Sequence, residues 1–149
     1  MELSTILIVM TIGLLIVVYW MSRVRARELL SNPRFVELTN VQELDDLFSS
    51  SRRHAQLLFL YDPWCPISAA ATRQMTQLER KVMTINVSHR HDLSRQIEKR
   101  TGIRHESPQA IVIDQGVAVW DASHSAITSQ TLASVMREIE DENDRSSSA

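Results

Sequence analysis

The only cysteine of the chain lies between an apolar segment and a helix-forming segment. Cys65 comes four residues after the run at 57–61, and Pro66 suits the first turn of a helix, where its missing N–H is not needed. The positive end of the helix dipole favours a thiolate there, and the thiolate is the nucleophile. Ser68 fills the second position of a Cys-x-x-Cys motif. We therefore expect a one-thiol redox site that accepts a mixed disulfide but closes no disulfide within its motif.

Composition limits the classes of protein that fit. Without its first thirty residues, the 149-residue chain leaves about 110–120 residues, enough for one domain with its own core. A net charge of −2 gives no basic field for nucleic acid. A lone cysteine excludes a disulfide scaffold and a zinc finger, and a free thiol persists best in a reducing compartment.

The amino-terminal segment is strongly apolar. Residues 3–21 carry no charge and would span roughly 28 Å as a helix, close to the hydrocarbon thickness of a bilayer. Glu2 precedes the run, and three arginines follow it (Arg23, Arg25 and Arg27). This pattern predicts a single-pass anchor over residues 1–22 in the cell membrane, with the membrane as a partner and the carboxyl-terminal domain in the cytoplasm.

Hydrophobic periodicity predicts an α/β domain over residues 35–140, preceded by a linker at 23–34 and followed by a disordered tail at 141–149. Strands are expected at 35–38, 56–61, 82–87, 109–113 and 117–120. Helices are expected at 40–48, 66–78, 92–100 and 128–140. This order is that of a thioredoxin-like fold, a central mixed sheet with helices on both faces, here preceded by one transmembrane helix.

Three sequence blocks resemble the bacillithiol-system redox-active protein YtxJ family, also called monothiol bacilliredoxins. They are Cys-Pro-Ile-Ser-Ala-Ala-Ala at 65–71, His-Glu-Ser-Pro-Gln at 105–109 and Trp-Asp-Ala-Ser-His-Ser-Ala-Ile-Thr at 120–128. Their order and spacing match the family, and the similarity covers residues 35–139. The chain differs from the family in its apolar amino-terminal segment and in residues 61–64.

The resemblance implies a thioredoxin-like fold and removal of bacillithiol from protein mixed disulfides. Bacillithiol, a cysteine–glucosamine–malate thiol, is the exchanging thiol, and no tightly bound cofactor is expected. Cys65 would attack the mixed disulfide, and a second thiol would reset Cys65. The implied partners are bacillithiolated proteins and bacillithiol itself.

Five neighbours of Cys65 are expected to stabilise the thiolate or bind the substrate: Trp64, Pro66, Ser68, Ser107 and Pro108. Ser68 either donates a hydrogen bond to the thiolate or fills the first helical turn. Position and resemblance favour a cis bond before Pro108, which would leave the Ser107 backbone to pair with an extended substrate. Trp64 could equally well be a hydrophobic surface that contacts the substrate beside the thiol or a half-buried residue that packs against the domain.

Other residues have plainer interpretations. Asp62 fits a turn with Pro63 better than it fits tuning of the thiol, because a nearby carboxylate disfavours a thiolate. His105 and His124 fall in the family blocks and are either loop residues or ligands for the malate carboxylates. His89 and His91 fit a solvated loop, so no metal site is expected.

Two other functions stay open. A membrane-anchored, non-catalytic adaptor would use the Trp64 and Pro108 surface for binding and would need no activated thiol. An iron–sulfur carrier would use Cys65 as a cluster ligand, although Cys-Pro-Ile-Ser differs from the Gly-Phe pattern of monothiol glutaredoxins. Cys65 itself could also be a buried structural cysteine that acts as a small hydrophobe.

Overall fold

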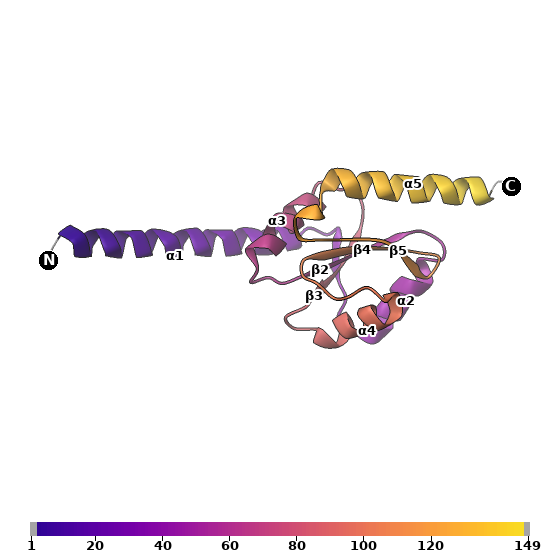
Figure 1. Ribbon diagram of the computed structural model, residues 1–149, viewed down its shortest axis with the longest axis horizontal. Coiled ribbons are helices and arrows are strands. Elements are labelled where there is room, and N and C mark those ends of the chain that lie inside the picture. Colours follow the sequence, from indigo (N-terminus) through magenta and orange to yellow (C-terminus); the bar gives the residue numbers. More distant parts are fainter. Residues whose placement is uncertain (1–2, 148–149) are drawn as a thin grey trace.

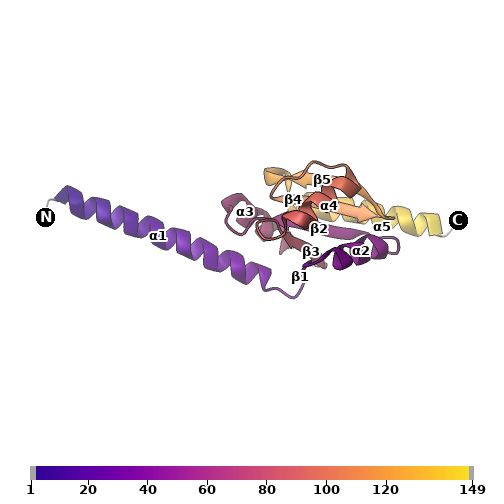
Figure 2. The same cartoon turned by 90° about the horizontal axis from the view of Figure 1, so that it is seen from below.

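The structure, a computed structural model, describes residues 3–147, and within them the side chains of residues 5–21 and 31–146. A long helix projects from a domain in which helices lie on both sides of a sheet (Figures 1 and 2). The elements are α1 (Leu3–Leu30), β1 (Phe35–Glu37), α2 (Val41–Ser50), β2 (Gln56–Tyr61), α3 (Pro66–Met75), β3 (Val82–Asn86), α4 (His91–Thr101), β4 (Gln109–Asp114), β5 (Val117–Ser123), the 3-10 turn η1 (His124–Ala126) and α5 (Ser129–Ser147).

The sheet is mixed, as predicted. Its strand order is β1-β3-β2-β4-β5, with β1, β3 and β2 parallel to one another and β4 antiparallel to both β2 and β5. Leu57 to Tyr61 are buried in succession because β2 lies in the middle and is covered on both faces. The carboxyl end of β2 leads to Cys65, so a strand in the middle of the sheet positions the thiol.

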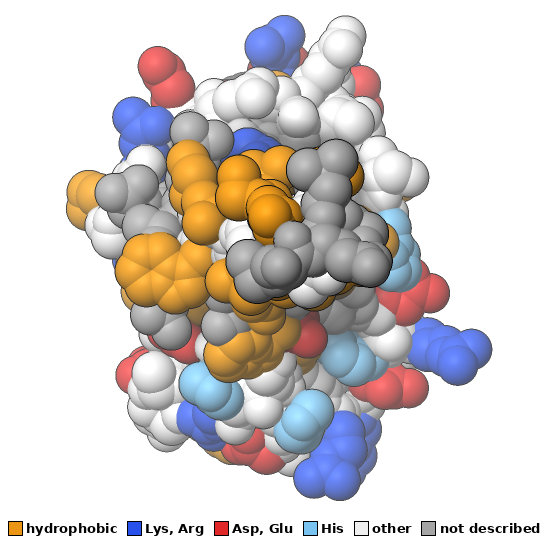
Figure 3. Space-filling view, turned by 90° about the vertical axis from the view of Figure 1, so that its left-hand side faces the viewer, with side chains coloured by type: hydrophobic (Ala, Val, Ile, Leu, Met, Phe, Trp, Pro, Cys, Tyr) orange, Lys and Arg blue, Asp and Glu red, His pale blue; other side chains and the backbone are white. Residues whose placement is uncertain are grey.

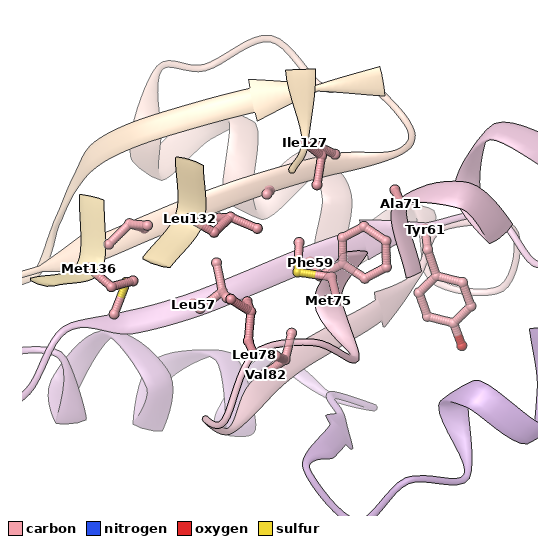
Figure 4. Close-up of a cluster of buried hydrophobic side chains, with 12 residues drawn as sticks. Leu57, Phe59, Tyr61, Ala71, Met75, Leu78, Val82, Ile127, Leu132 and Met136 are labelled. Atoms are coloured by element: carbon pink, nitrogen blue, oxygen red, sulfur yellow. The ribbon is translucent and has the colours of Figure 1, made fainter. Parts of the chain in front are cut away.

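Alternating side chains of β2 divide the core into two clusters. Leu57, Phe59 and Tyr61 pack with α3 and α5 on one face, as Figure 4 shows. Leu58 and Leu60 pack with α2 and α4 on the other face. This two-sided covering, with α3 and α5 above the sheet and α2 and α4 below it in Figure 1, confirms the predicted thioredoxin-like layers.

Local signals in the sequence account for several boundaries. Asn40 caps α2 by accepting the Glu43 N–H at 2.9 Å through its side-chain oxygen. Gly102 ends α4 in the left-handed conformation, with φ 72°. The β4–β5 hairpin turns through Gln115 and Gly116, both at positive φ.

The predicted transmembrane anchor is wrong. Within the part of the chain that the structure describes, no helix is long and apolar enough to cross a membrane. The single-pass localisation was drawn from that anchor and is contradicted with it, and the structure gives no support to the membrane as a partner. Helix α1 instead runs unbroken from Leu3 to Leu30, across the expected start of the linker.

The carboxyl-terminal helix is longer than predicted. The sequence placed its end near Glu140 and a disordered tail after it, whereas α5 continues to Ser147. Asn143 lies in this extension and donates a side-chain hydrogen bond to Asp114 at 3.2 Å. A tertiary contact with the end of β4 therefore supports a segment whose polar composition indicated disorder.

Candidate active site at Cys65

Cys65 is the N-cap of α3. Its backbone is extended, with φ −94° and ψ 121°, and its carbonyl accepts the Ala69 N–H at 3.1 Å. Pro66 occupies the first turn, as predicted. The Cys65 side chain makes no capping hydrogen bond and is half-buried. The thiol therefore lies at the amino end of a helix and is not sealed in the core as a structural cysteine would be.

Asp62 connects the end of β2 to the cysteine turn. Its N–H donates to the Ser68 hydroxyl at 3.1 Å, and its carbonyl accepts the Cys65 N–H at 3.1 Å. Its carboxylate oxygen Oδ1 accepts the Trp64 N–H at 2.8 Å and the Ser88 hydroxyl at 2.8 Å. Asp62 is therefore a turn residue, as the sequence favoured, and it also links the turn to a distant loop.

Ser68 is buried, with 1 % of its surface exposed. Its hydroxyl accepts the Asp62 N–H, and its carbonyl accepts the Thr72 hydroxyl at 2.8 Å. Of the two predicted roles, the structure gives Ser68 a place in the framework of the first helical turn. A hydrogen bond from Ser68 to the thiolate stays a prediction.

The peptide bond between Ser107 and Pro108 is cis, as predicted. Leu60 in β2 pairs with Gln109 in β4, so Pro108 lies at the sheet edge from which β2 leads to Cys65. The Pro108 carbonyl accepts the His124 N–H at 3.0 Å. This hydrogen bond joins the proline loop to η1.

An apolar groove starts beside the cysteine and runs between α3 and η1. It is lined mainly by Pro66, Ile67, Ala70, His124 and Ile127. Ile67 is 49 % exposed, and Trp64 on the other side of Cys65 is 55 % exposed. Figure 3 shows hydrophobic side chains at the centre and left of the face from which α1 projects, with histidines along its lower and right rim.

The histidines have separate surroundings. Burial lowers the pKa of His105, whose Nδ1 is buried without a hydrogen-bond partner among the described residues. His124 Nδ1 lies 3.4 Å from the Glu106 carboxylate, and His89 Nδ1 lies 3.4 Å from the Asn86 amide. In the described part of the chain, no group of three His, Cys, Asp or Glu side chains could hold a metal ion.

Comparison with known proteins decides the family. The sequence profile described as "Monothiol bacilliredoxin BrxC" matches residues 36–132, more than half of the chain. The chain belongs to the monothiol bacilliredoxin family. This confirms the resemblance drawn from the three sequence blocks, and it indicates a thiol redox function for this bacilliredoxin.

Solved structures agree on the fold. One structure described as having a thioredoxin fold is 27 % identical to this bacilliredoxin, with a TM-score of 0.63, and the match covers 67 % of this chain and 91 % of the other. Thioredoxin from Fasciola hepatica is 13 % identical, with a TM-score of 0.56 and coverage of 69 % and 97 %. A poplar thioredoxin h mutant is 17 % identical, with a TM-score of 0.56 and coverage of 75 % and 87 %.

The sequence did not point to Ser88. It follows β3 and reaches Asp62 because β2 and β3 run parallel, with Tyr61 paired to Asn86. A signal for this contact exists only once that register is known, since the two residues lie 26 positions apart.

Proposed function

We propose that this bacilliredoxin is a monothiol thiol–disulfide oxidoreductase that removes bacillithiol from protein mixed disulfides through Cys65. The observation that carries the proposal is the half-buried thiol at the N-cap of α3, with Ser68 at the position of a second cysteine. Such a site takes up a thiol but needs an external thiol to release it.

The reaction consists of two thiol–disulfide exchanges. The Cys65 thiolate attacks the bacillithiol sulfur of the mixed disulfide, a new sulfur–sulfur bond forms, and the client cysteine leaves as a thiolate. A second low-molecular-weight thiol, as its thiolate, then attacks the bacillithiol sulfur on Cys65. Cys65 leaves as a thiolate, and the two small thiols depart joined by a disulfide. The client is reduced, the small thiols are oxidised, and Cys65 returns to its starting state.

The surroundings of Cys65 support a polypeptide substrate. The groove between α3 and η1 offers apolar surface beside the thiol, and Trp64 adds exposed aromatic surface before it. In the proposed complex, the Ser107 backbone pairs with an extended client segment next to Pro108. Pro66 starts the helix whose dipole favours the thiolate.

The test uses the full chain and a bacillithiolated model protein with one modified cysteine. With excess bacillithiol present, the wild-type protein should remove the adduct faster than bacillithiol alone, as followed by intact mass spectrometry. The Cys65→Ser variant should give only the uncatalysed rate, and Ser134→Ala, an exposed site on α5, should match wild type. Equal rates for Cys65→Ser and wild type would disprove the proposal and favour a non-catalytic binding module.

A further inference from the structure

Asp62 uses four hydrogen bonds to join separate parts of the fold. Its N–H contacts Ser68 in α3, its carbonyl receives the Cys65 N–H, and its Oδ1 receives both the Trp64 N–H and the Ser88 hydroxyl. Asp62 and Ser88 are partly buried, and both contacts to Oδ1 are 2.8 Å. Asp62 thus fixes both residues that precede α3 relative to the end of β2, Trp64 through its side chain and Cys65 through its backbone carbonyl.

The loop that carries Ser88 is itself held in place. The Val87 N–H donates to the Tyr61 carbonyl at 3.0 Å, which extends the pairing of β3 with β2. The N–H groups of His89 and Arg90 donate to the Asn86 carbonyl at 3.2 and 2.9 Å. Ser88 therefore donates to Asp62 from a fixed position, and the carboxylate is clamped between the β3–α4 loop and the cysteine turn.

The geometry points to Asp62 as the positioning residue for Cys65, with Ser88 as its support. This inference rests on the part of the proposed function that makes Cys65 the attacking nucleophile. The negative charge of Asp62 cannot promote the reaction, because a carboxylate near a thiol disfavours the thiolate. Asp62 therefore acts through the hydrogen bonds that its Oδ1 accepts. A turn held by Asp62 keeps the sulfur in one position for attack, and small displacements of a reacting group reduce rates strongly.

Three variants separate the hydrogen-bond acceptor of Asp62 from its negative charge. Asp62→Asn removes the charge but keeps an oxygen acceptor for the Trp64 N–H and the Ser88 hydroxyl, whereas Asp62→Ala removes both the charge and the acceptor. Ser88→Ala removes only the hydrogen bond from Ser88 to Asp62. Asp121→Asn, at an exposed position on β5, is the matched control. The probe is 5,5′-dithiobis(2-nitrobenzoate), an aromatic disulfide whose exchange with Cys65 releases a coloured thiolate. This probe contains no bacillithiol, so the result does not depend on which natural mixed disulfide is the substrate.

We expect the second-order rate constant at pH 7 to fall about tenfold or more in Asp62→Ala, and severalfold in Ser88→Ala. Asp62→Asn should stay within about threefold of wild type, and Asp121→Asn should equal wild type. The double variant Asp62→Ala/Ser88→Ala should be no slower than Asp62→Ala, because Ser88 acts through Asp62. If Asp62→Ala acted only by weakening the fold, its urea midpoint would fall, and Asp62→Asn would not restore the exchange rate.

A second readout follows the turn directly. In a background with Trp20→Phe and Trp120→Phe, Trp64 is the remaining tryptophan. Its fluorescence anisotropy should fall in Asp62→Ala and recover in Asp62→Asn. A wild-type exchange rate in Asp62→Ala, or an equal loss in Asp62→Asn and Asp62→Ala, would overturn the inference. If Asp62→Ala does not fold, Ser88→Ala and Asp62→Asn decide: a wild-type rate in Ser88→Ala, or a tenfold loss in Asp62→Asn, would overturn it.

The two proposals fail separately. If the probe responds as expected but bacillithiolated protein is not a substrate, Asp62 still positions Cys65 and the proposed substrate is wrong. If bacillithiolated protein is a substrate but the variants exchange at the wild-type rate, the proposed function stands and the positioning role is wrong.

Discussion

His124 donates its backbone N–H to the Pro108 carbonyl at 3.0 Å while it adopts the left-handed conformation, with φ 55°. The contact ties η1 to the proline loop beside the groove. Asparagine tolerates this conformation, whereas a β-branched side chain is strained in it. Valine and asparagine at this position both lack the imidazole ring, so the difference in stability between these two variants reports on strain in the backbone.

We therefore expect His124→Val to lower the free energy of unfolding by about 1–2 kcal/mol relative to His124→Asn. Urea unfolding followed by circular dichroism measures this difference. Loss of the exposed contact with Glu106 should itself matter little, because surface ion pairs contribute about 0–1 kcal/mol. Equal stability of the two variants would contradict a strained backbone at this position.

Ser68→Cys should convert the site from one thiol to two. Cys65 is the N-cap and residue 68 lies in the first turn of α3, the spacing of a Cys-x-x-Cys motif. A bacillithiol adduct on Cys65 should then be released by the new thiol, which leaves an intramolecular disulfide detectable by non-reducing peptide mapping. Ser68→Ala, which adds no thiol, should keep the adduct. A stable adduct in Ser68→Cys would show that the two positions do not reach each other.

Stability should fall at high pH because of Tyr61. Burial, followed by the nearby Glu37 charge, raises the pKa of Tyr61 to about 12 from its ordinary value near 10. The folded state therefore favours the neutral phenol, so this contribution is complete below pH 10 and is lost between pH 10 and 12, by at most about 2–3 kcal/mol. Tyr61→Phe keeps the ring, which stacks with Phe59 at 6.0 Å between centroids, and should remove this part of the pH dependence. Urea midpoints of both proteins from pH 8 to 11.5 measure it, and parallel profiles would contradict the burial effect.

His105 should reduce the stability of the fold as the pH falls into the mildly acidic range, whereas Tyr61 reduces it as the pH rises. Burial lowers its pKa, so the folded state favours the neutral ring. The unfolded chain binds a proton first as the pH falls below about 6.5, and stability is lost as the pH falls further through the lowered value. His105→Gln should flatten the decrease in urea midpoint between pH 7 and 5. Equal slopes for His105→Gln and the wild-type protein would contradict the burial effect.

Local signals predicted much of the fold. The apolar run of β2 and Pro66 after Cys65 act within a few residues, and the structure places both as expected. Gly102 after α4 and the turn at Gly116 are local signals of the same kind, and they end α4 and join β4 to β5. The cis bond before Pro108 was expected from its position together with the family resemblance, and the structure has it.

The features that the sequence did not predict depend on distant contacts or on length. Asp62 meets Ser88 only because β2 and β3 align in parallel, and α5 continues past Glu140 where Asn143 contacts Asp114. The apolar composition of residues 3–21 suggested a membrane span, but no helix in the described part of the chain is long and apolar enough to cross a membrane. Sequence periodicity predicts neither the register of paired strands nor a hydrogen bond between a helix and a distant strand.

The most direct test of the account is to locate bacillithiol after one exchange. The full chain is mixed with an equal amount of bacillithiolated model protein without free bacillithiol, quenched with acid, and mapped by peptide mass spectrometry. The account predicts that bacillithiol leaves the client cysteine and appears on Cys65 in equal amount, with no transfer to Cys65→Ser. Retention of bacillithiol on the client, with Cys65 unmodified, would contradict it.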